Sequence, residues 1–542
     1  MVDNTVYIKQ LDHSYMQVWS NDDCPEQELY EHFKFEVEGH QFSPKFKSGL
    51  WDGFKKLYSL KTKLIRVGLK GRVVKFLEDR GYKVVEEVND EGGRKCRNDY
   101  VTTTDHPVIE SYIRKLPLSR IDSQDLVPME LYDYQVNGAV AALQSSRRIL
   151  VSPTSSGKST TLYASIRWVL DTYPDSRVML IVPSKGLVEQ MWSDFTEYSH
   201  ASGWIVEEHC QKISGDYTKD ITKRVVITTW QSQTGRPPKY FDQFQAIFVD
   251  EAHEADSDSI SKILDSAKNT PIKIGVTGTL KDCAIHELEM VGLFGEPYQV
   301  VTTKELMDRG IVSPLKIKCV VFDHPESEKA KIRKIQKDYR LKKREDTFDY
   351  ADEMEYIISH EQRNRFIVNL ANDLDGNVLI LFNYVEKQGK VIQKLLEDSP
   401  KAVHFIDGSV KSSNREQIRK KVNTSVSDRS NIILASYGTT SRGWSVNTID
   451  YIIFATSYKS KVRNLQSIGR GLRLSKGKDC CVLYDIADDL STKNGKVPSG
   501  HKLNASMKHL LERLSIYDSE QFNYKLTRIE LDDPKPIQSS SA

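Results

Sequence analysis

Residues 148–160 read RILVSPTSSGKST, a short apolar run followed by a glycine-containing loop and a helix-like segment, Thr160–Leu170. A loop between a strand and a helix directs backbone N–H groups and the helix N-terminus at anionic oxygens. Lys158 is placed to reach the β- and γ-phosphates of a nucleotide, and the Ser159 hydroxyl to bind Mg²⁺. The residues predicted to surround the phosphates are Thr154, Ser155, Ser156, Gly157, Lys158, Ser159 and Thr160.

This loop departs from the GxxxxGK[ST] pattern at its first position, where Ser152 replaces glycine. The alternative interpretation is a chance Gly-Lys-Ser in an ordinary loop. A strand-like run before the loop and a helical run after it favour the phosphate site.

Apolar runs like the one before the loop recur through two long regions. Each has four to six residues, is rich in Val and Ile, and is continuous rather than alternating, which is typical of parallel strands covered on both faces. The first set is Arg148–Ser152, Val178–Val182, Val225–Thr229, Ala246–Asp250 and Lys273–Thr277; the second is Val378–Phe382, Ala402–Ile406, Asn431–Ser436, Tyr451–Ala455 and Cys481–Asp485. The sequence therefore predicts an α/β chain with two tandem parallel-sheet domains.

Two carboxylates follow the fourth run of the first region. Asp250 would hold Mg²⁺, and Glu251 would orient and deprotonate an attacking water, which is the pairing that ATP hydrolysis needs at the carboxyl edge of a sheet. His253 would couple this site to a neighbouring segment. The alternative is a helix N-terminus with solvated acids.

In the second region, residues 466–473 read QSIGRGLR. Arg470 and Arg473 are three positions apart, a spacing that puts both on one face of a helix. They could reach across a cleft to a γ-phosphate, as an arginine finger does. The alternative is a basic helix face without a catalytic role.

Length and composition exclude several classes of protein. The 542 residues, 39% hydrophobic and 28% charged, fit a globular chain of three or four domains. No stretch approaches the roughly 18 apolar residues of a membrane span, and the N-terminus lacks a signal-peptide layout. Seven cysteines without CxxC spacing predict free thiols and no structural zinc. We therefore expect a cytoplasmic protein.

Basic residues are concentrated in two places although the net charge is only +2. Residues 45–83 hold twelve Lys/Arg and three Asp/Glu, and residues 329–344 hold nine Lys/Arg and one Asp, followed by an acidic stretch to Glu355. Such segregation is compatible with a nucleic-acid footprint. The alternative, solvated helix faces, is the preferred interpretation of the second run.

Aromatic and basic residues alternate in the segment FKFEVEGHQFSPKFKSGLWDGFKKLY, residues 33–58. Aromatic rings offer stacking faces and lysines follow phosphates, as in single-strand or junction binding. The alternative is a small core, for which the candidates are Phe33, Phe35, Phe42 and Phe46. The residues expected at the surface to contact DNA are Lys45, Lys47, Trp51, Lys55 and Lys56.

The order of motifs resembles that of superfamily 2 helicases and translocases, in which two RecA-like domains clamp ATP. This resemblance covers residues 130–490 and implies an adenine-reading role for Gln135, DNA-backbone contacts for Thr229 and Gln231, and a contact near Tyr437 on the second domain. The fold class that it implies is two tandem RecA-like parallel-sheet domains with a small α+β N-terminal domain.

The N-terminal cluster is similar to that of UvsW-like phage helicases and extends the resemblance over nearly the whole chain. It implies an ATP-dependent DNA helicase that unwinds and branch-migrates forks, four-way junctions and R-loops in phage recombination, repair and replication, with 3′→5′ travel. ATP and Mg²⁺ are the implied cofactors. The implied partners are branched, single-stranded and duplex DNA and RNA in RNA–DNA hybrids, and we expect a monomer in the host-cell cytoplasm.

Two other functions stay open on the sequence alone. One is an ATP-driven duplex-DNA translocase or RNA helicase, in which the same ATP-hydrolysing domains act on a different nucleic acid. The other is a non-catalytic DNA-binding module, against which the intact lysine, carboxylates and arginines argue.

The expected domain organisation has four parts. An α+β nucleic-acid-binding domain occupies residues 1–125, the ATP-binding RecA-like domain residues 126–312, and the second RecA-like domain residues 313–495. Residues 496–542 are expected to form one amphipathic helix, about Asn504–Tyr517, and a disordered tail.

Overall fold

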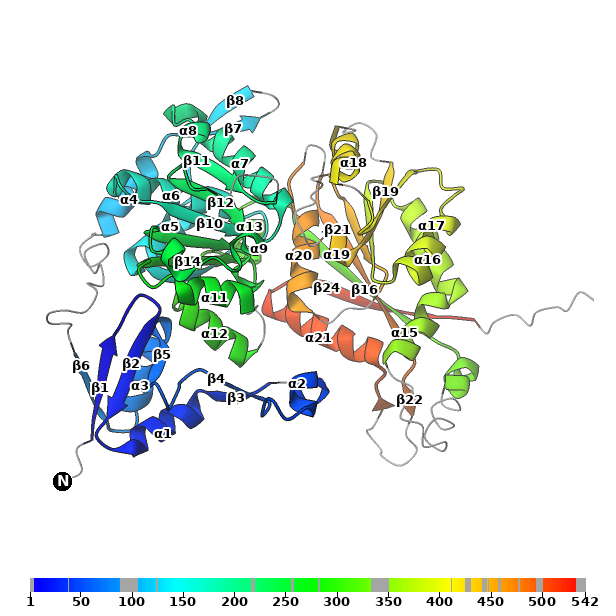
Figure 1. Ribbon diagram of the computed structural model, residues 1–542. Coiled ribbons are helices and arrows are strands. Elements are labelled where there is room, and N and C mark those ends of the chain that lie inside the picture. Colours follow the sequence, from blue (N-terminus) through cyan, green and yellow to red (C-terminus); the bar gives the residue numbers. More distant parts are fainter. Residues whose placement is uncertain are drawn as a thin grey trace, which may run out of the picture. The chain divides into compact units, whose positions relative to one another are not determined.

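The computed structural model spans the chain in two compact units, residues 1–301 and 302–542, shown in Figure 1. The structure describes all residues except 1–3, 38, 88–105, 123–124, 216–219, 255–257, 281–282, 333–349, 411, 425–429, 441–445, 447, 457–459, 476–477, 494–500 and 533–542. Most of the second basic run and the end of the expected tail lie outside the described residues.

A seven-stranded sheet forms the centre of unit 1. Its order is β11-β12-β10-β13-β14-β9-β15, and every neighbouring pair is parallel. The strands are β9 (Arg147–Val151), β10 (Val178–Val182), β11 (Cys210–Ile213), β12 (Val225–Thr229), β13 (Ala246–Asp250), β14 (Ile272–Thr277) and β15 (Pro297–Gln299). Because carboxyl ends of parallel strands share one edge, the segments after β9 and β13 meet there with β14 between them.

This sheet is buried on both faces. In β10, Val178, Leu180 and Val182 point into one hydrophobic cluster, whereas Met179 and Ile181 point into another, as the two-residue period of a strand requires. The first cluster includes residues of α5 (Asp133–Ser145), α6 (Lys158–Thr172) and α7 (Lys185–Ser199); the second includes residues of α11 (Asp258–Ser266) and α12 (Ala284–Phe294). Because side chains on both faces of each strand are buried, the strands appear in the sequence as continuous apolar runs.

The N-terminal part of unit 1 has its own four-stranded sheet, ordered β5-β2-β1-β6. The strands are β1 (Thr5–Gln10), β2 (Tyr15–Ser20), β5 (Leu64–Arg66) and β6 (Lys83–Glu86), with helices α1 (Asp23–His32) and α3 (Lys70–Glu78). A separate hairpin of β3 (Lys34–Glu36) and β4 (Phe54–Lys56) extends from this sheet and carries α2 (Pro44–Lys47) between its strands (Figure 1). The basic and aromatic segment of the sequence is therefore this hairpin and its tip.

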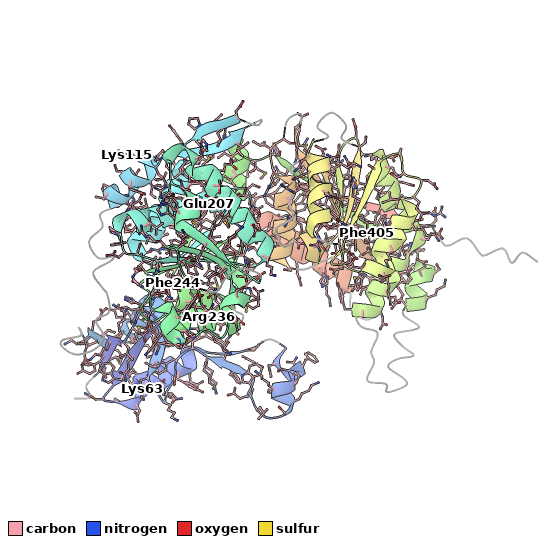
Figure 2. The ribbon with its side chains drawn as sticks, turned by 45° about the horizontal axis from the view of Figure 1, so that its top comes forward. Lys63, Lys115, Glu207, Arg236, Phe244 and Phe405 are labelled. Carbon is pink, nitrogen blue, oxygen red and sulfur yellow. The ribbon has the colours of Figure 1, made fainter. Side chains whose placement is uncertain are left out.

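The N-terminal sheet shares a hydrophobic cluster with the second face of the seven-stranded sheet. The cluster joins Val6 and Phe76 to Met290 of α12 and to Phe244, which is fully buried and labelled in Figure 2. At Gly68 any side chain would collide with backbone carbonyls of α12. The two parts of unit 1 therefore pack backbone against backbone at this point.

Ion pairs border this packed region. Arg66 donates two hydrogen bonds to Asp265, at 3.0 and 2.8 Å. Arg72 donates to Glu287 and to both carboxylate oxygens of Glu296, at 2.8 to 2.9 Å. Two-point pairing of this kind fixes orientation as well as adding binding energy.

Unit 2 contains a second seven-stranded parallel sheet, ordered β18-β19-β17-β20-β21-β16-β24. Its strands are β16 (Leu315–Asp323), β17 (Val378–Phe382), β18 (Ala402–Ile406), β19 (Asn431–Ser436), β20 (Tyr451–Phe454), β21 (Cys481–Asp489) and β24 (Tyr524–Glu530); its longer helices are α15 (Tyr350–Ser359), α16 (Glu361–Asp373), α18 (Ser412–Thr424), α20 (Lys461–Gly471) and α21 (Ala505–Ser519). In Figure 1, α16 lies on one side of this sheet and α20 and α21 on the other. Both sheets have the RecA-like architecture, so the predicted fold class is confirmed.

The apolar runs predicted as strands are all strands, and most agree to the residue. Within the two seven-stranded sheets, four strands were not predicted: β11, β15, β16 and β24. The segment expected to be only a helix and a tail contains β24, which pairs with β16 along seven residues.

Among the described residues the cysteines are all free thiols, and no described helix is long and apolar enough to span a bilayer.

Candidate functional site

The loop between β9 and α6 forms the predicted phosphate-binding turn. Gly157 and Ser155 adopt the left-handed conformation, with φ of 82° and 69°. From α5, the Tyr134 hydroxyl and the Gln135 side-chain amide both donate to the carbonyl of Ser156, at 3.0 and 2.9 Å. Glycine is required at 157 both for the backbone angle and because a Cβ there would collide with the Gln135 amide.

Lys158 is the first residue of α6, and its Nζ lies 3.2 Å from Oε1 of Glu251. Burial lowers the pKa of Lys158, but the nearby Glu251 and Asp250 outweigh this effect and raise it above its ordinary value. The lysine is therefore charged at neutral pH, in the form that attracts a phosphate.

The two carboxylates after β13 have opposite electrostatic environments. Burial and the charge of Glu251 raise the pKa of Asp250 to about 6. Burial alone would also raise the pKa of Glu251, but Lys158 and His253 lower it to about 2. Glu251 also has a left-handed φ of 49°, which is uncommon for a residue with a side chain. Adjacent carboxyl groups whose pKa values are shifted in opposite directions are typical of catalytic sites.

The predicted Mg²⁺ ligands fit a cation on their own chemistry. Asp250 is 5% exposed, and its Oδ1 has no hydrogen-bond partner among the described residues. The hydroxyl of Ser159, on the first turn of α6, lies 2.9 Å from the hydroxyl of Tyr198 on α7. Oxygen donors of this kind are what Mg²⁺ prefers. Tyr198 gave no signal in the sequence as a partner of this site.

His253 connects the acidic pair to β14. Its Nδ1 lies 3.3 Å from Oε2 of Glu251 and 2.9 Å from the hydroxyl of Thr277, the last residue of β14. The next residue, Gly278, lies against Lys158, because a Cβ at 278 would be 3.5 Å from Nζ. The coupling to a neighbouring segment that the sequence suggested for His253 is therefore present.

The two arginines of unit 2 do not share a helix, contrary to the prediction. Arg470 lies in α20, which ends at Gly471, and Arg473 lies beyond this end. A side chain at 471 would collide with Cys481 and Ile452, so the chain turns where only glycine fits. The Lys478 ammonium bonds the carbonyls of Gly471 and Arg473 and caps the helix.

The lysines of the N-terminal hairpin have two kinds of environment. Lys45 and Lys47 on α2 are exposed. Lys55 forms an ion pair with Glu289 of α12, and Lys56 one of 2.6 Å with Asp52. Trp51 is half-buried, and its indole N–H donates to the carbonyl of Phe54 at 2.8 Å.

Two apolar side chains stand beside the exposed lysines at this tip. Phe42 is 73% exposed and Leu50 is 83% exposed. The sequence had offered Phe42 as part of a small core; the structure shows it in solvent, whereas Phe33 is fully buried.

The residues near the two sheets that were predicted to contact DNA differ in their exposure to solvent. Gln231 is exposed on the short helix α9 (Trp230–Gln233), whereas Thr229 is 4% exposed and its hydroxyl lies 3.0 Å from that of Ser232. Tyr437 is 2% exposed, and its hydroxyl donates to the carbonyl of Thr456. The ring of Tyr437 is therefore part of the core of unit 2 and offers no surface to a base.

These features define a class of protein. A phosphate loop whose lysine contacts the glutamate of an Asp-Glu pair at the carboxyl end of another strand of the same parallel sheet, followed by a second RecA-like domain, is the arrangement of superfamily 2 helicases and translocases.

Comparison with known proteins gives the family. The N-terminal model described as DNA helicase UvsW matches residues 5–87. Models described as the res subunit of type III restriction enzymes and as the helicase conserved C-terminal domain match residues 128–282 and 361–475. The ATP-dependent DNA helicase uvsW of Enterobacteria phage T4 is 31% identical over 523 residues, 94% of this chain and 97% of the relative. The chain belongs to the UvsW family of ATP-dependent DNA helicases.

Two solved structures are similar to this chain. The crystal structure of T4 UvsW aligns with 97% of this chain and 99% of its own, at 28% identity and a TM-score of 0.48. The DNA-bound type ISP restriction-modification enzyme LlaBIII aligns with 85% of this chain and 36% of its own, at 14% identity and a TM-score of 0.52.

Proposed function

We propose that this helicase uses ATP hydrolysis to unwind and branch-migrate forked and four-way-junction DNA and to remove RNA from R-loops, travelling 3′→5′. We further propose that it works as a monomer in the host-cell cytoplasm during phage recombination, repair and replication. Membership of the UvsW family supports a DNA substrate. The observation that carries the catalytic part is the contact of Lys158 with Glu251, beside an oxygen of Asp250 that has no hydrogen-bond partner in the described part of the chain.

In this proposal the residues of unit 1 bind and hydrolyse ATP. Lys158 neutralises the β- and γ-phosphates, while backbone N–H groups of the loop from Thr154 to Thr160 surround them. Ser159 and Asp250 hold Mg²⁺, which would neutralise charge on the phosphates when bound. Glu251, ionised at neutral pH, accepts the proton of the attacking water.

Gln135 is assigned to the nucleotide site as well. Its amide oxygen accepts from the backbone N–H of Tyr132, and its NH₂ group holds Ser156. Reading of the adenine by this side chain would require exchange of one of these bonds. Its present contacts support a role in shaping the loop.

Arg470 and Arg473 are proposed to complete catalysis from the second RecA-like domain by stabilising charge on the γ-phosphate. An arginine that acts in this way is worth roughly 10³–10⁵ in rate where it has been measured. The capped end of α20 supports this role, because it holds the backbone between the two arginines in a fixed turn.

DNA contacts are proposed at three places. Lys45, Lys47 and the half-buried Trp51 would select branched DNA through phosphates and stacking rather than through sequence. Thr229 and Gln231 would hold a strand on the first RecA-like domain. The backbone beginning at Tyr437 would do so on the second, since its ring is buried.

The four-part division at residues 125, 312 and 495 belongs to this proposal. It assigns branch recognition to the N-terminal part, ATP binding to the next and coupling to the third. Along the chain, the boundary between the two compact units of the structure follows residue 301, which lies within the second of these parts.

The test is ATPase stimulation and unwinding compared across single-stranded, duplex, forked and four-way DNA and RNA duplexes. The proposal expects the strongest stimulation by branched DNA. Activity only on RNA, or hydrolysis that no nucleic acid stimulates, would reject it in favour of an RNA helicase or a non-catalytic binding module.

A further inference from the structure

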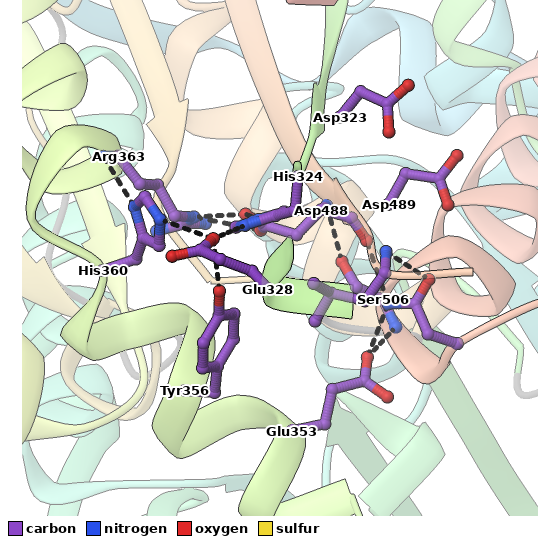
Figure 3. A network of polar contacts seen from close by, with 12 residues as sticks. Asp323, His324, Glu328, Glu353, Tyr356, His360, Arg363, Asp488, Asp489 and Ser506 are labelled. Atoms are coloured by element: carbon purple, nitrogen blue, oxygen red, sulfur yellow. Dashed lines mark hydrogen bonds and ion pairs between the residues drawn. The ribbon is translucent and has the colours of Figure 1, made fainter. Parts of the chain in front are cut away.

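Two imidazoles and a carboxylate converge within unit 2, outside the residues assigned to ATP or DNA. His324 follows β16, Glu328 lies in the helical turn after it, and His360 lies between α15 and α16 (Figure 3). One ligand atom of each residue lies within 4.8 Å of the ligand atoms of the other two. Among the described residues, no other three His, Cys, Asp or Glu side chains have such an arrangement. His324 is 1% and Glu328 8% exposed.

The distances between these atoms suit a shared metal ion better than direct hydrogen bonds. Oε2 of Glu328 lies 3.4 Å from Nδ1 of His324 and 3.2 Å from Nε2 of His360. Charge-assisted N–H···O bonds are usually about 2.7–2.9 Å long. Ligands on a tetrahedral ion with bonds of about 2.0–2.1 Å are about 3.3 Å apart.

The other nitrogen of His324 has the outer partner that a metal ligand needs. Nε2 of His324 lies 3.1 Å from Oδ1 of Asp488 at the end of β21. Asp488 is in turn held by two hydrogen bonds from Nε of the buried Arg363, each 3.0 Å. A carboxylate behind a histidine fixes the tautomer in which the remaining nitrogen is free to bind a metal.

The charges of the cluster leave room for a cation. Both nitrogens of His324 face carboxylate oxygens, so a neutral ring would leave one of them opposed to another acceptor. The charge of Arg363 balances that of Asp488 only. Tyr356 donates to the same oxygen of Glu328 and orients it, but it brings no charge.

His360 is already oriented toward Glu328. Its Nδ1 accepts a long hydrogen bond, 3.4 Å, from the backbone N–H of Arg363. Binding a metal through Nε2 moves the ring proton to Nδ1 and gives up this weak contact. The cost is small beside a metal–imidazole bond.

We propose that His324, Glu328 and His360 bind one divalent transition-metal ion of the zinc class, with a water in the fourth position. Two imidazoles and a carboxylate are a ligand set suited to zinc. The ion would join the end of β16 to the start of α16, which are far apart in sequence, and Asp488 adds β21 through the outer contact. Its effect is to hold these three elements in register.

The alternative is a metal-free cluster in which His324 contacts Glu328 and Asp488 directly. The two alternatives differ in whether the protein takes up a metal ion from solution. Full-length protein from which metal has been removed is titrated with Zn²⁺. The Co²⁺ form is examined by its visible absorption, which is intense for four-coordinate sites. We expect one ion per chain and a melting temperature that rises with Zn²⁺ and falls with chelator.

Glu328→Gln and His360→Ala should each weaken binding by at least as much as the about 10- to 100-fold loss that outer-partner changes produce. His404→Ala is the matched control, because His404 is half-buried in the same unit and contacts Asn431. Equal Zn²⁺ binding by wild type and the two ligand variants would overturn the proposal.

A second measurement does not depend on whether the variants fold. X-ray absorption of the zinc-loaded wild-type protein should show two imidazoles with oxygen ligands. Sulfur ligands would assign the ion to the free cysteines instead, and no uptake at all would leave the metal-free cluster as the correct description. Either result would refute the site.

Discussion

Lys158 and Glu251 are 93 positions apart, yet Nζ of one lies 3.2 Å from Oε1 of the other. The contact joins the residue predicted to hold phosphate to the residue predicted to activate water. A bound γ-phosphate would compete with Glu251 for the same ammonium group. Arrival of the nucleotide would therefore release the base from its ion pair at the moment when it is needed.

The first prediction concerns Lys158→Ala. The charge that binds the β- and γ-phosphates is removed, so hydrolysis should fall to background while DNA binding stays within about twofold, because the predicted strand contacts use other residues. Phosphate release and fluorescence anisotropy with a forked DNA measure the two effects. Full turnover by this variant would remove the assignment of the loop.

Glu251→Gln should separate binding from chemistry. The amide cannot accept the proton of water, so turnover should fall by about 10²–10⁴. ATP affinity should be unchanged or higher, because a negative charge beside the phosphates is gone. A rapid-quench experiment against nucleotide binding distinguishes this outcome from a structural defect, which would weaken both.

Asp250→Asn should change how stability depends on pH. Because the pKa of Asp250 is raised to about 6 in the folded protein, this carboxyl favours folding at low pH and loses that contribution as the pH rises through about 6. Without nucleotide or metal, the variant should gain up to about 3 kcal/mol over wild type between pH 4 and pH 7, at roughly 1.4 kcal/mol per pKa unit. Denaturant unfolding at several pH values measures it; a constant difference would contradict the assignment.

The hairpin tip provides a prediction on salt dependence. Lys45→Ala with Lys47→Ala should weaken binding to four-way DNA and reduce the slope of log K against log salt by about 0.9 for each DNA phosphate that is no longer neutralised. Lys55 and Lys56, already paired with Glu289 and Asp52, should matter less. Lys61→Ala, an exposed change in the same part of the chain, is the control. An unchanged slope would reduce the tip to a scaffold.

Arg66→Ala tests the attachment of the N-terminal part. The two hydrogen bonds to Asp265 are removed, and the remaining carboxylate is left partly buried, so unfolding should become easier by about 2 kcal/mol. A double-mutant cycle with Asp265→Ala should return a coupling energy of similar size. Arg80→Ala, whose pair with Glu28 is more exposed, should cost less. Equal costs for both arginines would show that the Asp265 pair adds nothing special.

The sequence predicted the buried strands well because both faces of each are covered, so Val, Ile and Leu fill consecutive positions. It missed β16 and β24 for the opposite reason. In β16, Lys316 and Lys318 interrupt the apolar run, and β24 is mostly exposed along its length. Backbone pairing, rather than side-chain pattern, puts these two strands in the sheet.

The candidate site was predictable where chemistry sits in one short segment, as in the loop at Lys158 and the pair at Asp250. What the sequence could not show were contacts made across the fold. Tyr198 meets Ser159 from another helix, and Gly471 ends α20 between the two arginines because Cys481 fills the space beside it. The grouping of His324 with His360 likewise depends on how the turn between α15 and α16 packs against the end of β16.

The pairing of β24 with β16 has a consequence for synthesis of the chain. β16 is translated some two hundred residues before β24, and until Tyr524–Glu530 emerge its outer backbone groups have no strand beside them. A nascent or prematurely stopped chain would present that row to other chains and invite aggregation. Deletions or fusions placed before Tyr524 should therefore lower the yield of well-folded protein even where every residue of the nucleotide site is intact.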